Sequence, residues 1–292
     1  MVFVTPIILW TYGLLSLAVL GLWLPGKCLL TPLALAAAIA AGFYGRILQP
    51  LALLWPVLLA AGLLLAERAA LAKFWRTLAW LVALIVATGL IFHWLPGFAN
   101  PKVIADWRFG PDSLPYSKYL NFDGILLGLC VLGCTRHRLR KVGEWRQLGK
   151  RMLPILLLTT IAVLGASLAL AFVRWQTKWS ELFWLWAWGN LLSTCLVEEA
   201  FFRGLLQRGL MRWLKRWRHG EKWAIVLAAA LFGLKHLQGG WTYAGLATLA
   251  GIGYGTAYQA TGRVEAAILS HFGLNCLHFL LFSYPALSAG GI

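Results

Sequence analysis

Charged residues are scarce in this chain. Only 12% of its 292 residues are Asp, Glu, Lys or Arg, whereas 60% are hydrophobic. A soluble domain carries about 25% charged residues, so this composition excludes an ordinary soluble protein. Apolar stretches of nearly membrane-spanning length recur along the chain, which indicates an integral membrane protein with one domain.

Acidic residues are the scarcer of the two charge types. Ten Asp and Glu residues stand against 26 Lys and Arg residues, which gives a net charge of +16. A basic surplus can indicate nucleic-acid binding. In a membrane protein, however, basic loops set the orientation and lie on the cytoplasmic side. We therefore expect no nucleic-acid partner.

Several sequence signatures are missing. The five cysteines include no Cys-x-x-Cys pair, so we expect no disulfide framework. Neither the Gly-x-Ser-x-Gly motif of serine hydrolases nor the His-Glu-x-x-His motif of zinc proteases occurs. The stretch 2–24 has no basic segment before it and no small-residue cleavage site, which predicts a retained first span.

The apolar runs predict an all-α fold, a polytopic transmembrane bundle of about eight to ten helices, because lipid cannot satisfy a free backbone amide. The pair 29–45 and 47–66 is compatible with two crossings or with a re-entrant hairpin. The runs are 2–24, 29–45, 47–66, 77–96, 122–135, 152–173, 181–207, 223–238, 241–260 and 264–283.

Two basic linkers, 136–151 and 203–222, orient the predicted helices. Each contains seven Lys or Arg residues and one Glu, so both are expected in the cytoplasm. Two crossings separate them, which keeps the assignment consistent. The loop 97–121 then lies outside and is expected to be an ordered or lid-like loop. We expect an integral protein of a bacterial inner (cytoplasmic) membrane.

Ionisable residues inside membrane spans are costly and are candidates for function. In the run "LVEEAFFRGLL", Glu199 and Arg203 are four residues apart, the spacing at which helical side chains meet. Glu198 projects about 100° away from Glu199. Arg203 can therefore neutralise one glutamate while the other faces elsewhere, unless both carboxylates simply lie at the membrane interface.

Two further polar motifs follow in the C-terminal third. Phe232 and His236 share a helix face in "FGLKH", and His271 and Asn275 share one in "SHFGLNCLHF". Taken alone, His236 is compatible with a packed histidine, and the second pair with hydrogen bonds that only hold helices together. Taken together, the motifs supply a base to activate water and donors for an oxyanion, as amide hydrolysis requires.

The three motifs resemble those of the CPBP intramembrane proteases, the group that contains the Rce1-type CAAX prenyl endopeptidases and the bacterial Abi proteins. They read Glu-Glu-x-x-x-Arg, Phe-x-x-x-His and His-x-x-x-Asn, each on its own predicted helix and in that order. The resemblance covers roughly residues 181–283. It divides the single domain into N-terminal accessory helices, 1–151, and a CPBP-like catalytic core, 152–292.

The resemblance implies a role for each motif residue. Glu198 would be the general base with His236 beside it, and His271 and Asn275 would stabilise the oxyanion. Supporting roles fall to Glu199, Arg203 and Phe232. The expected mechanism is that of a glutamic protease without a cofactor, although two His and one Glu are also a ligand set for Zn²⁺.

The function expected from the sequence is an intramembrane endopeptidase that cleaves a membrane-anchored peptide or protein in the lipid bilayer. In a bacterial inner membrane, that substrate need not be prenylated. One alternative is a membrane immunity or scaffold protein that binds a peptide without cutting it. Another is a transporter that uses the same polar residues as an ion path.

Overall fold

The computed structural model describes residues 1–24, 29–134, 139 and 141–288. Within them, the chain is mostly helical, as the sequence predicted, with ten helical segments. They are α1 (Pro6–Gly21), α2 (Leu30–Tyr44), η1 (Pro50–Leu53) leading into α3 (Leu54–Ala66), α4 (Lys73–Ile91), α5 (Phe122–Cys134), α6 (Val142–Ala169), the continuous run from α7 (Phe183–Asn190) to α9 (Arg208–Trp213), α10 (Gly220–Lys235), α11 (Trp241–Thr261) and α12 (Val264–Leu281).

The membrane assignment rests on the length and composition of these helices. Within the described residues, α4, α6 and α12 are each long and apolar enough to cross a bilayer. Shorter apolar helices add to them at Pro6–Gly21, Leu30–Tyr44, Pro50–Ala66 and Phe122–Cys134. The bundle is that of an integral membrane protein.

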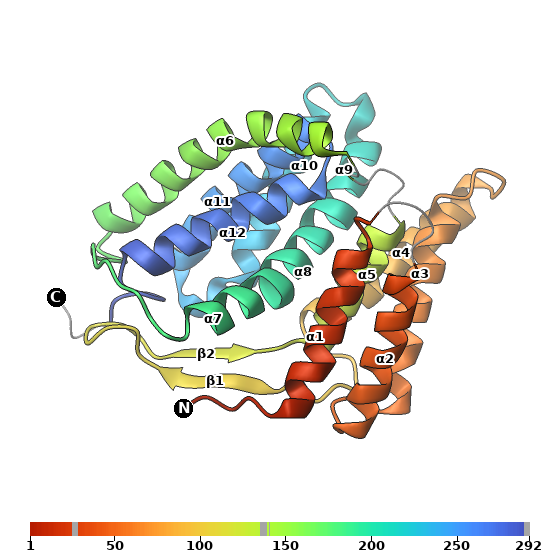
Figure 1. Ribbon diagram of the computed structural model, residues 1–292. Helices are drawn as coiled ribbons and strands as arrows, with labels where there is room; N and C mark the ends of the chain where they lie inside the picture. Colours follow the sequence, from red (N-terminus) through yellow and green to blue (C-terminus); the bar gives the residue numbers. More distant parts are fainter. Residues whose placement is uncertain (25–28, 135–138, 140, 289–292) are drawn as a thin grey trace.

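The predicted outer loop 97–121 is a β-hairpin. Strands β1 (Lys102–Trp107) and β2 (Tyr116–Tyr119) pair in antiparallel fashion. The N-terminus extends the hairpin, because Val2 bridges to Ile104. Figure 1 shows the hairpin at one end of the bundle, whereas the α3–α4 and α9–α10 connections lie at the opposite end.

The basic linkers are partly helical. In the predicted linker 136–151, residues 136–138 and 140 lie outside the described residues, and α6 already begins at Val142. In the predicted linker 203–222, residues 203–213 continue the helix that carries the glutamates. Of the five cysteines, Cys28 lies outside the described residues, and Cys130, Cys195 and Cys276 are free thiols.

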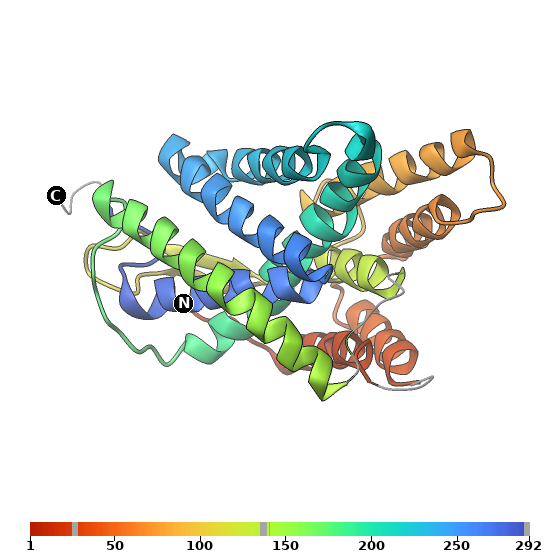
Figure 2. The same cartoon turned by 90° about the horizontal axis from the view of Figure 1, so that it is seen from above.

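The two halves of the chain share a core. Figure 2 shows α1–α4 on one side of the molecule and α6 and α10–α12 on the other. A single cluster of buried side chains runs between them and includes Tyr12, Leu126, Val197 and Phe232. Ring packing and apolar contacts therefore continue from the N-terminal helices to the helices that carry the three motifs.

Small residues bring the motif helices close together. A Cβ atom at Gly251 of α11 would lie 3.2 Å from the backbone of Ala229 in α10, and one at Gly233 would lie 2.6 Å from the carbonyl oxygen of Ala244. Glycines let helix backbones approach in this way in membranes. The close packing of α10 on α11 positions His236, which follows directly after α10.

Candidate active site

Both glutamates lie on one distorted helix. The helix runs from residue 183 to 213, and α8 (Leu196–Glu199) is flanked by wider π-helical turns, η2 (Leu191–Cys195) and η3 (Ala200–Gln207). Such turns occur frequently at functional sites. Glu198 is 5% exposed and Glu199 is fully buried, so the two carboxylates lie inside the bundle rather than at the membrane interface.

Glu199 belongs to a buried ion-pair network. Its Oε2 lies 3.1 Å from Nε of Arg203, as the four-residue spacing predicted, and its Oε1 lies 2.8 Å from Nδ1 of His271. The Arg203 guanidinium also donates to the carbonyl oxygen of Gly251 at 2.8 Å and faces the ring of Phe232. Pairing of this kind offsets the free-energy cost of removing the charges from water.

Glu198 faces a different set of groups. Nζ of Lys235 donates to its Oε1 at 2.8 Å, and Nε2 of His236 lies 3.9 Å from the same oxygen. The other oxygen, Oε2, lies 4.0 Å from Nε2 of His271 and is buried with no hydrogen-bond donor among the described residues. One carboxylate oxygen is therefore anchored, and the other is left for a small molecule such as water.

The two imidazoles are oriented by their Nδ1 atoms. His236 Nδ1 lies 2.7 Å from the carbonyl oxygen of Phe232, which requires a proton on that nitrogen. His271 is held through Nδ1 by Glu199, and its ring stacks on Tyr254 with centroids 4.6 Å apart. In both residues, Nε2 is the nitrogen nearer to Glu198.

Asn275 is held by a residue that the motifs did not indicate. Its Nδ2 donates to Oδ1 of Asn190 at 3.2 Å, and the same oxygen accepts from the thiol of Cys195. Asn190 is 4% exposed and lies at the end of α7. The sequence signal that could have indicated Asn190 is a polar amide within an apolar run.

These side chains line one cavity of about 460 Å³. Glu198, His236, His271, Asn275 and Phe232 all contribute to its wall, whereas Glu199 and Arg203 lie behind it. His278 and five tyrosines line it as well, namely Tyr116, Tyr119, Tyr243, Tyr254 and Tyr284.

Lys118 of the hairpin also lines this cavity. Its Nζ donates to Oγ1 of Thr194 at 2.5 Å. Burial of this ammonium lowers its pKa to about 8. Sequence reasoning placed the residue in an outer loop and therefore missed it.

Comparison with known families gives one match. Residues 179–277 match the family model described as type II CAAX prenyl endopeptidase Rce1-like. This segment is an Rce1-like domain. The match contains all three motifs and confirms the family that they predicted, and at the level of the family it suggests an intramembrane endopeptidase. No curated protein and no solved structure matches the chain.

The donor set of the Rce1-like domain does not fit a zinc ion in this arrangement. Within the described residues, no three His, Cys, Asp or Glu side chains are placed to hold a metal. Glu198 lies 3.9 and 4.0 Å from the two imidazole nitrogens. Ligands of one tetrahedral Zn²⁺ would lie roughly 3.3 Å apart. The Lys235 ammonium also occupies the Glu198 oxygen nearest His236.

Proposed function

We propose that this protein is an intramembrane endopeptidase that hydrolyses a peptide bond of a membrane-anchored substrate with water activated by Glu198. The observation that carries the proposal is the buried Oε2 of Glu198, which has no donor among the described residues and lies 4.0 Å from Nε2 of His271. One water molecule can bridge two polar atoms at that separation. The carboxylate is then in place to accept the proton of the attacking water.

The remaining residues have complementary roles in this proposal. Lys235 fixes the other oxygen of Glu198, so the carboxylate cannot rotate freely. His236 stands beside it with its Nε2 directed inward. His271 and Asn275 stabilise the oxyanion, because both line the Glu198 cavity and the amide of Asn275 is held by Asn190 and by the sulfur of Cys195. A prenyl group on the substrate is not required by any of these roles.

We further propose that the reaction proceeds without a bound metal. The Lys235 ammonium supplies positive charge next to Glu198, the place where a zinc ion would otherwise act. Protein reconstituted in liposomes is therefore expected to keep its cleavage rate after treatment with EDTA and after treatment with 1,10-phenanthroline. The measurement is mass spectrometry of new peptide termini. Loss of cleavage with both chelators, reversed by Zn²⁺, would refute a metal-free reaction.

We also propose a bacterial inner membrane in which the basic ends of the helices face the cytoplasm. Lys150 in the first half of α6 and Tyr119 on β2 are both exposed, and Figure 1 shows that α6 begins at the end of the bundle opposite the hairpin. In a background without native cysteines, Lys150→Cys should react with a membrane-impermeant maleimide only after permeabilisation. Tyr119→Cys should react in intact spheroplasts. The reverse pattern would invert the topology.

A further inference from the structure

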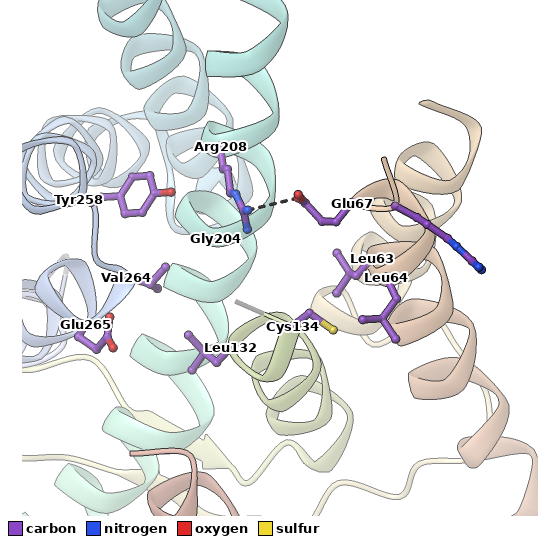
Figure 3. A pocket seen from close by; sticks show the side chains of 12 residues that line it. Leu63, Leu64, Glu67, Leu132, Cys134, Gly204, Arg208, Tyr258, Val264 and Glu265 are labelled. Atoms are coloured by element: carbon purple, nitrogen blue, oxygen red, sulfur yellow. Dashed lines mark ion pairs between the residues drawn. The ribbon is translucent and has the colours of Figure 1, made fainter. Parts of the chain in front are cut away.

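A second set of pockets lies away from the Glu198 cavity, between the N-terminal helices and α9. In Figure 3, Glu67 at the end of α3 reaches toward Arg208 on α9. Its Oε1 lies 3.2 Å from Arg208 and 2.6 Å from Arg212. Partial burial opposes ionisation of Glu67, but the hydrogen bond from Arg212 and the charge of Arg208 prevail and lower its pKa. These two arginines therefore already have an anionic partner.

A neighbouring pocket contains Arg212 and further cations that form no ion pair with a described residue. It has a volume of about 770 Å³ and lies between the first turns of α4 and the end of α9 with η4 (Leu214–Arg216). Among the residues that the structure describes, no acidic side chain lines it. Its charged lining residues are Lys73, Arg76, Arg212, Lys215 and Arg216, and of these only Arg212 forms an ion pair with a described residue.

Aromatic side chains place this pocket at the depth of lipid headgroups. Trp80 and Trp213 line it, with ring centroids 4.9 Å apart. Trp75 and Trp217 beside it are 57% and 65% exposed. Tryptophan collects at the membrane–water interface. In addition, α4 is one of the helices long enough to span the bilayer, and Lys73 is its first residue.

A glycine among the lining residues allows two helices to pack closely at this pocket. A Cβ atom at Gly209 would overlap the indole ring of Trp80, so α4 and α9 approach closely at this point. The cationic side chains stand around this contact on both helices. A surplus of positive charge over the single neighbouring carboxylate of Glu67, a cavity open enough for a headgroup and flanking tryptophans together match the chemistry of a phosphodiester at a membrane surface.

We propose that the pocket between α4 and α9 binds the phosphodiester headgroup of an anionic phospholipid. It shares no lining residue with the Glu198 cavity, so this lipid site does not depend on peptide cleavage. Lys215 and Arg216 contact the headgroup from the α9 side, and Lys73 contacts it from the α4 side.

The test uses the full-length protein, delipidated in an uncharged detergent. Phosphatidylglycerol is added back, and bound lipid is measured by native mass spectrometry alongside the shift in Tm. Phosphatidylcholine with the same acyl chains and inorganic phosphate are the comparison ligands. The wild type should bind phosphatidylglycerol and gain thermal stability from it, whereas neither comparison ligand should reproduce that gain.

Two double variants that remove the same number of charges distinguish binding in this pocket from general electrostatic attraction to the protein surface. Lys215→Gln with Arg216→Gln removes pocket charges, whereas Arg218→Gln with Lys222→Gln removes two exposed charges outside the pocket. Each basic residue near a membrane surface contributes about 1 kcal/mol to binding anionic lipid, so the pocket variant should bind roughly 30-fold more weakly. The control should stay within about twofold of wild type, because its two charges are exposed, lie outside the pocket and are screened by salt.

A third variant keeps the proposal testable if the pocket double variant fails to fold. Lys73→Gln alters the exposed α4 side of the pocket and should weaken binding about fivefold. Equal weakening by the pocket and control pairs would overturn the proposal, as would no loss in Lys73→Gln. An equal Tm shift with inorganic phosphate would show a free-anion site instead of a lipid site.

Discussion

Replacement of Glu198 by Gln is expected to abolish peptide cleavage while leaving the fold intact. The amide oxygen of Gln can still accept the hydrogen bond from Lys235, so the packing of the cavity is retained. The group that accepts the proton from water is lost, and general-base catalysis typically contributes about 10²- to 10⁴-fold to the rate. The loss is measured as the rate at which new peptide termini appear in reconstituted membranes.

Glu265→Gln is the matched control for this substitution. Glu265 is also 5% exposed and lies on a membrane helix, where it accepts a hydrogen bond from the indole of Trp23. It does not line the Glu198 cavity, so its variant should cleave at close to the wild-type rate per folded molecule. Wild-type cleavage by Glu198→Gln would refute the assigned mechanism, because the protein would then cleave without this carboxylate.

Replacement of Arg203 by Leu is expected to cause the largest loss of stability. Arg203 and Glu199 are both fully buried, so the variant leaves a carboxylate charge in the bundle with only His271 to compensate it. Removing one partner of a buried pair costs about 3–5 kcal/mol. The measurement is chemical or thermal unfolding of the purified protein in detergent.

Arg208→Gln on the same helix is the control for Arg203. Its pair with Glu67 is about one-third exposed on both sides, and exposed pairs contribute at most about 1 kcal/mol. The double variant Glu199→Gln with Arg203→Leu removes both charges and should be less destabilised than Arg203→Leu alone. Equal losses for Arg203→Leu and Arg208→Gln would contradict the buried-network account.

The helices could be predicted from the sequence because a bilayer requires apolar runs of a certain length. The start of α6 could not, since residues 142–151 are too charged to belong to such a run. Glu144 accepts a hydrogen bond from the backbone amide of Lys141 there, but Lys at the N-cap does not match the Ser/Thr-x-x-Glu signature of a helix start. The β-hairpin was also missed, because its two short strands show no regular alternation of apolar and polar residues.

In the candidate site, predictions succeeded where they concerned neighbours on one helix. The pairing of Glu199 with Arg203 follows from their spacing. The contacts of Glu199 with His271 and of Glu198 with Lys235 join different helices. Such contacts depend on how the helices pack and rotate against one another. The spacing of residues along one helix gives no information about this. For the same reason, Asn190 and Lys118 became visible only in the folded chain.

The most direct test of the account uses isotopically labelled water. Membranes containing the wild-type protein or Glu198→Gln are incubated in H₂¹⁸O, and new peptide C-termini are analysed by mass spectrometry. If Glu198 activates water inside the cavity, wild-type membranes yield new C-terminal carboxylates that carry ¹⁸O, and Glu198→Gln membranes yield none above background. Labelled termini at equal levels in both samples, or in neither, would contradict the central claim.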